Sequence, residues 1–160
     1  MRGFLGFLAL AVAFATMPAW CGEASGQLMV SVTVVASCRL SVDTTALSFG
    51  NVDQDAGSAS AAVDLGVRCS SRQPYAIGFD YGEHAVGAQR HMSNGSAEVS
   101  YQLYADASRR HALGPHGSGG ELQGIGNGEE QRLPLYARLD LDRNTPAGTY
   151  SDVVRMTVTW

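Results

Sequence analysis

The feature that most constrains the fold of this chain is the alternation of apolar side chains from Gly26 to Ala36 (GQLMVSVTVVA). Apolar residues at every second position are typical of an extended strand with one buried face. The apolar residues of that face are Leu28, Val30, Val32 and Val34. A strand needs a sheet to join, so this stretch pairs either within its own domain or with a neighbouring molecule.

The composition indicates one globular domain with a substantial core. The chain has 160 residues, of which 45% are hydrophobic and 16% charged, and this length and balance require no second domain. Acidic residues outnumber basic ones by 15 to 11, and the net charge is -4. Such a chain offers no basic surface for nucleic acid or anionic lipid, so we expect no nucleic-acid partner.

Residues 1–24 have the pattern of an export signal. Arg2 supplies the positive charge, Phe4–Phe14 the apolar segment, and Gly22–Ala24 a small-x-small cleavage site. The mature chain is then expected to begin near Ser25, with cleavage after Gly26 as an alternative. The apolar segment is too short for a good membrane span.

The cysteines follow from this export prediction. Cys38 and Cys69 are the only pair left in the mature chain, and an oxidising compartment favours a disulfide between them. A cysteine nucleophile is the rival interpretation, but neither residue has an obvious histidine partner. Cys21 raises the alternative of a lipoprotein, which the bulky Trp20 before it disfavours.

The rest of the chain predicts short strands and no amphipathic helix of useful length. Strands are expected near Leu40–Val42, 47–50, 61–69, 75–81, 89–92, 99–103, 133–139 and 150–160. Pro134 suggests an edge strand or an irregular start, and the glycine-rich stretch 105–130 is expected to be a long loop or frayed hairpin. About seven strands at this spacing predict an all-β sandwich.

Catalytic and metal-binding patterns are weak. Asp140-x-Asp142-x-Asn144 copies the start of a calcium loop, but Thr145 stands where such a loop needs glycine. His111 and His116 lack further metal ligands nearby in the sequence, and no G-x-S-x-G motif occurs. We therefore expect no catalysis, no bound metal and no cofactor.

Several short motifs together carry a resemblance to a known family. Two of them are Ala36-Ser37-Cys38 and Gln89-Arg90-His91-Met92, and the others are Leu47-Ser48-Phe49-Gly50, Val67-Arg68-Cys69, Tyr75-Ala76-Ile77, Tyr101–Asp106 and Pro146–Asp152. In this order, with an export signal and two cysteines, the chain resembles the spore coat protein U domain family over residues 26–160. That family includes the pilins of archaic, Csu-type chaperone-usher pili.

The resemblance implies an incomplete immunoglobulin-like β-sandwich that lacks its last strand and is completed in trans by donor-strand complementation. The expected partners are a periplasmic chaperone, an outer-membrane usher and neighbouring subunits joined head to tail. The product would be a cell-surface fibre or coat supporting adhesion or biofilm formation, reached through the periplasm. The expected domains are residues 1–24 as signal peptide, 25–37 as donor segment and 38–160 as sandwich.

Site residues follow from combining this mechanism with the alternation. Leu28, Val30, Val32 and Val34 are predicted to be the donor residues. The predicted lining of the acceptor groove, which is also the chaperone contact, is Val154, Met156, Val158 and Trp160. The alternative is a self-contained secreted β-sandwich that binds a ligand such as a glycan, with the N-terminal strand in its own sheet.

Overall fold

The computed structural model describes residues 25–41 and 46–160. The predicted export signal (1–24) and Val42 lie outside these residues. The described chain contains one short 3-10 helix, η1 (Gln54–Ala56), and the strands β1 (Cys38–Ser41), β2 (Ser58–Cys69), β3 (Pro74–Phe79), β4 (Arg90–Ser93), β5 (Glu98–Tyr104), β6 (Leu122–Ile125), β7 (Glu130–Asp140) and β8 (Met156–Thr159). Over the same residues, no helix is long and apolar enough to cross a membrane.

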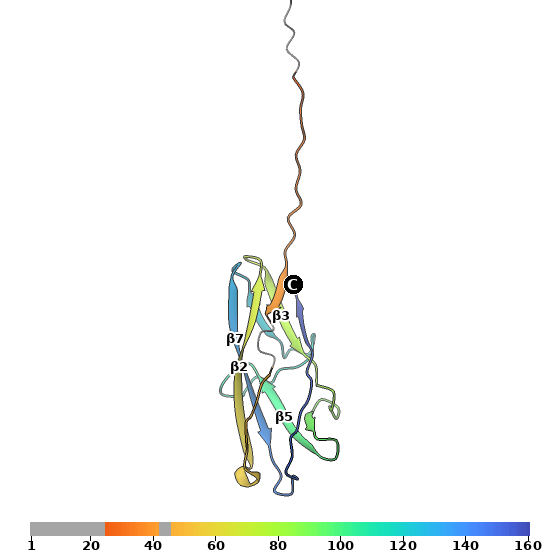
Figure 1. Cartoon of the computed structure of the whole chain (residues 1–160). Coiled ribbons are helices and arrows are strands. Elements are labelled where there is room, and N and C mark those ends of the chain that lie inside the picture. The colour runs from red at the N-terminus through yellow and green to blue at the C-terminus, as the bar shows by residue number, and fades with distance from the viewer. Residues whose placement is uncertain (1–24, 42–45) are drawn as a thin grey trace, which may run out of the picture. The chain divides into compact units, whose positions relative to one another are not determined.

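The strands form two antiparallel sheets that enclose a common core (Figure 1). One sheet has five strands in the order β1-β2-β7-β5-β4, and the other has three in the order β6-β3-β8. Inward-facing side chains of both sheets meet between them, and Val67, Ile77 and Ala137 are fully buried. This arrangement confirms the predicted all-β sandwich.

Most core strands lie where the alternation predicts them. In β5 the buried residues are Val99, Tyr101 and Leu103, and the residues between them are half-buried. The hairpin between β4 and β5 turns at Asn94-Gly95, and Gly95 has a φ of 89°, which favours glycine at this turn. The period of two therefore identifies these strands because each has one face in the core.

The prediction of a long loop or frayed hairpin across residues 105–130 is wrong at β6, which is a strand of the three-stranded sheet. This strand pairs with β3, with Leu122 opposite Ile77 and Gly124 opposite Tyr75. A Cβ on Gly124 would lie 2.4 Å from the Tyr75 hydroxyl oxygen, so glycine makes room for the buried ring. Gly124 therefore permits the packing of Tyr75, and because glycine is uncommon in strands it also makes β6 difficult to recognise in the sequence.

The expectation of an edge or an irregular start at Pro134 holds locally, although β7 as a whole is not an edge strand. β7 is an interior strand that pairs with β2 along its whole length. Its pairing with β5, however, begins only at Tyr136 opposite Tyr104. Pro134 therefore lies where β7 has a single neighbour, and its missing N–H costs no hydrogen bond on the β5 side.

Two predicted strands are shorter or absent. Residues 47–50 form no strand, although Leu47 and Phe49 pack partly buried against the core. The predicted strand 150–160 is reduced to β8, because Ser151 forms an isolated bridge with Ser93 and residues 152–155 are outside any ladder. Both stretches have the apolar alternation of a strand but lack a paired neighbour.

The predicted disulfide is confirmed. Cys38 and Cys69 are directly opposite each other at the ends of β1 and β2, with an S–S distance of 2.05 Å. The bond ties the first strand of the body to the interior of the five-stranded sheet.

Removing the disulfide is expected to destabilise the sandwich by roughly 3 to 4 kcal/mol, the loop-entropy value for a closed loop of this size. The measurement is urea unfolding of the mature chain with both Cys38→Ser and Cys69→Ser. The wild-type chain treated with dithiothreitol is the matched control and should unfold at the same urea concentration as the double variant. Equal stability of the oxidised chain and the double variant would contradict this expectation.

Candidate assembly groove

A mostly apolar groove is lined by residues of both sheets. Its volume is about 340 Å³. One wall is formed by Ser41, Ala46, Leu47 and Phe49, and the other by Tyr150, Ser151, Asp152, Val154 and Met156. The floor consists of residues of β2, β3, β4, β5 and β7, namely Val63, Asp64, Leu65, Phe79, Met92, Tyr101, Leu103 and Leu135. We call this cavity the assembly groove.

A second cavity of about 450 Å³ adjoins the assembly groove. The two share Leu47, Phe49, Met92 and Tyr150 in their linings. The second cavity is more polar and reaches the turn at residues 145–149.

Each wall of the assembly groove includes one residue of an edge strand, namely Ser41 of β1 and Met156 of β8. β1 is one edge of the five-stranded sheet and β8 is one edge of the three-stranded sheet. Within the described residues, no ladder joins β1 to β8. An unpaired edge presents free N–H and C=O groups, so the groove combines an apolar floor with hydrogen-bonding groups that can receive another strand.

The four predicted acceptor residues have different positions. Val154 and Met156 line the assembly groove. Val158 is partly buried against the core but is outside the groove lining. Trp160 is 57% exposed. The acceptor role of all four stays a prediction, with Val154 and Met156 the best placed.

The four predicted donor residues are almost fully exposed. Their exposed fractions are between 85% and 88%, and residues 25–37 contain no strand. Aliphatic side chains at alternate positions would gain favourable free energy if they were transferred from water into an apolar groove. Their role as a donor strand stays a prediction.

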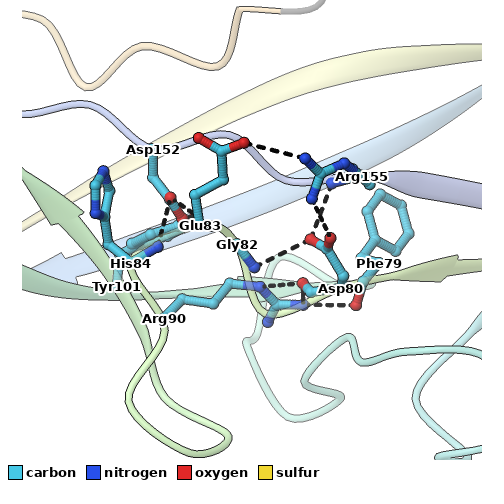
Figure 2. A network of polar contacts seen from close by, with 9 residues as sticks. All are labelled: Phe79, Asp80, Gly82, Glu83, His84, Arg90, Tyr101, Asp152 and Arg155. Carbon is cyan, nitrogen blue, oxygen red and sulfur yellow. Dashed lines mark hydrogen bonds and ion pairs between the residues drawn. The ribbon is translucent and has the colours of Figure 1, made fainter.

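A polar cluster next to the groove was missed by sequence reasoning (Figure 2). Tyr101 is 6% exposed and donates its hydroxyl proton to Asp152 Oδ2 at 2.6 Å. Burial, together with this hydrogen bond, raises the pKa of Tyr101 far above its ordinary value. Asp152 Oδ1 accepts the backbone N–H groups of Glu83 and His84. The partners are 51 and 68–69 residues away in sequence, so no local pattern indicates them.

Arg90 was also missed, and it is completely buried. Its guanidinium donates to the backbone carbonyls of Phe79, Asp80 and Leu113 and to the side-chain oxygen of Gln102. Burial lowers its pKa, whereas the tyrosines and aspartates around it act in the opposite direction. The only signal in the sequence is its place within Gln89-Arg90-His91-Met92. This motif contributes to the family resemblance but does not by itself indicate a structural role for the arginine.

Comparison with known proteins agrees with the resemblance. A model of the Spore Coat Protein U domain matches residues 24–157. The "Protein U" of Myxococcus xanthus is 29% identical over 159 residues, covering 89% of this chain and 88% of its own length.

Solved pilus structures share the fold. A chain of the CsuC-CsuE chaperone-tip adhesion subunit pre-assembly complex, from archaic chaperone-usher Csu pili of Acinetobacter baumannii, matches 80% of this chain with a TM-score of 0.60 and 24% identity. The match spans 40% of that Csu chain. The P pilus rod subunit PapA has a TM-score of 0.57 and 15% identity, covering 76% of this chain and 97% of its own.

A chaperone-usher pilus structure that explains rod uncoiling gives a TM-score of 0.55 at 15% identity, over 91% of this chain and 99% of its own. At these identities the structural matches establish the immunoglobulin-like sandwich of pilins, while the domain match establishes the family. This chain belongs to the Spore Coat Protein U domain family.

Proposed function

We propose that this protein is a structural subunit of an extracellular chaperone-usher fibre or coat, assembled by donor-strand exchange and supporting adhesion or biofilm formation. The observation that carries the proposal is the assembly groove between two unpaired sheet edges, in a chain whose N-terminal segment exposes alternating apolar residues. Strand addition to a free edge satisfies its hydrogen bonds and fills its side-chain pockets. No catalysis or cofactor enters this function.

The dimensions of donor and groove are compatible. At about 3.3 Å per residue, residues 28–34 span about 20 Å in extended form. The C-terminal wall of the groove runs from Tyr150 to Met156, a stretch with the same number of positions. Burying Leu28, Val30, Val32 and Val34 would contribute roughly 6 to 10 kcal/mol before ordering costs, which favours a long-lived contact.

The topology favours a donor strand antiparallel to β8. Cys38 pairs with Cys69, and after the turn at residues 70–73 the next strand places Ala76 opposite Thr159. The start of β1 and the end of β8 are therefore at one end of the sandwich. An antiparallel donor brings its own body to the other end, so successive subunits extend the chain head to tail without closing a ring.

The proposed partners follow from the same groove. Before assembly, an open groove and a free edge are aggregation hazards, so a periplasmic chaperone would cover them until an outer-membrane usher passes the subunit to its neighbour at the cell surface. The alternative of a self-contained ligand-binding sandwich needs residues 28–34 in its own sheet. Residues 25–37 form no strand in the described chain, which favours the fibre.

The test is complementation by a peptide. The chain lacking residues 25–36 is expected to gain thermal stability when a synthetic peptide of residues 25–37 is added, because a ligand that binds only the folded state stabilises it. A peptide of scrambled sequence is the control. A truncated chain whose unfolding temperature is the same with either peptide, or with none, would contradict donor-strand exchange.

A further inference from the structure

The C-terminal wall of the assembly groove crosses from one sheet to the other without a ladder. Ser151 pairs with Ser93 at the β4 edge of the five-stranded sheet, whereas Met156 already pairs with Phe79 in the three-stranded sheet. Residues 152–155, which we call the crossing segment, connect them. Within the described residues, its one backbone-to-backbone hydrogen bond joins Asp80 N–H to the carbonyl oxygen of Arg155.

Asp152 anchors the first end of the crossing segment. Its carboxylate accepts the N–H groups of Glu83 and His84 at 2.9 and 3.2 Å and the Tyr101 hydroxyl at 2.6 Å. Figure 2 shows this carboxylate between the loop and the tyrosine. A Cβ on Gly82 would lie 1.9 Å from Asp152 Oδ2, so glycine is required for the carboxylate to approach the loop. Asp152 thus joins the groove floor, at Tyr101, to the groove wall.

Asp80 anchors the second end. Its Oδ1 accepts the backbone N–H of Arg155 at 2.9 Å, and its own N–H donates to the Arg155 carbonyl at 3.0 Å. The backbone at Asp80 is itself fixed by the buried Arg90, which donates to the carbonyls of Phe79 and Asp80. Val154 lies between the two anchors and lines the groove.

We propose that Asp152 and Asp80 are positioning residues that keep the acceptor wall in its donor-binding shape while the groove is empty. A donor strand would supply ladder hydrogen bonds to this wall once it is bound, so the carboxylates matter most before binding. They raise the fraction of molecules that are competent to capture a donor, and a larger competent fraction speeds capture. The inference rests on the proposed function, because it assumes that the groove receives a donor strand.

The experiment uses the mature chain with Val32→Asp, whose own donor segment carries a charge and cannot fill a groove. The probe is a fluorescein-labelled peptide of residues 25–37 with the native sequence, and stopped-flow anisotropy gives association and dissociation rates. Asp152→Ala and Tyr101→Phe are introduced in this background. Asp142→Ala is the matched control, because Asp142 is an exposed carboxylate that accepts one backbone N–H, from Asn144.

Asp152→Ala is expected to slow association about tenfold, the size of effect that follows from losing hydrogen bonds to a charged group. Tyr101→Phe should slow it by a smaller factor, since it removes one of the three bonds. The dissociation rate should change less than about twofold in both variants, because the bound donor's ladder hydrogen bonds would then hold the wall in place. Hydrogen exchange of the unliganded Asp152→Ala chain should accelerate at the amides of Glu83, His84 and Arg155. Asp142→Ala should change none of these.

Association rates equal to the background in both variants would overturn the proposal, as would dissociation that accelerates as much as association slows. Such results with normal peptide binding leave the fibre function intact. A background chain that binds no peptide at all would instead refute the proposed function. In that case hydrogen exchange alone tests whether Asp152 anchors the groove wall. Unchanged hydrogen exchange at residues 152–156 in Asp152→Ala would refute this anchoring role as well.

Discussion

The mature chain with Val32→Asp is expected to remain monomeric under conditions where the wild-type chain forms fibres. Val32 is in the middle of the exposed apolar face, at 85% exposure, so the substitution costs the free monomer little. In a neighbour's groove the same carboxylate would lose its hydration against a mostly apolar lining, which costs several kcal/mol. Each 1.4 kcal/mol is about tenfold in affinity. Size-exclusion chromatography and electron microscopy of negatively stained samples provide the readout.

The adjacent residue supplies the control for this variant. Thr33→Asp adds the same charge on the opposite face of the strand, where a donor would point to solvent, and it should assemble nearly normally. Mixing gives a stronger test. Since the Val32→Asp chain keeps an intact groove, it should accept a wild-type donor and then end the fibre, so a small fraction should shorten wild-type fibres. Normal fibres from the variant alone would refute the donor assignment.

Strands with one face in the core were predictable from the sequence. In β5, Tyr101 and Leu103 are buried at every second position, which is the pattern that a two-residue period reports. β6 was not predictable, because Gly124 occupies the place where a neighbouring ring needs space. The stretch 47–50 shows the opposite failure. Its alternation is real, but a strand also needs a paired neighbour, and this stretch has none among the described residues.

The family resemblance predicts that an acceptor groove exists, but the sequence predicts only some of the residues that line it. Val154 and Met156 line it as the alternation suggests, yet Trp160, which continues the same period, is more than half exposed. The polar anchors could not be found from the sequence, because Asp80 and Arg155 are 75 residues apart. A carboxylate in a linear sequence is normally interpreted as a solvated group, and its role as an anchor depends on long-range contacts.

Arg90→Met is expected to lower the free energy of unfolding by about 3 to 5 kcal/mol, the range for breaking a buried charged network. Methionine fills much of the volume of the arginine stem but donates no hydrogen bond. The carbonyls of Phe79, Asp80 and Leu113 would lose their guanidinium donors in the interior, and each buried unsatisfied group costs about 1 to 3 kcal/mol. Urea unfolding of the monomeric Val32→Asp chain, with and without Arg90→Met, measures this loss.

The matched control is Arg138→Met in the same background. Arg138 forms an exposed ion pair with Asp140 at 3.0 Å, with its side chain 43% exposed, and surface pairs of this kind contribute about 0 to 1 kcal/mol. Arg90→Lys separates charge from geometry, since lysine keeps the positive charge but cannot reach four acceptors from a planar group. Arg90→Lys should therefore lose most of the stability that Arg90→Met loses. A lysine variant as stable as the parent chain would show that the charge alone stabilises this site, and a methionine variant equal to the Arg138 control would show that the buried network contributes nothing.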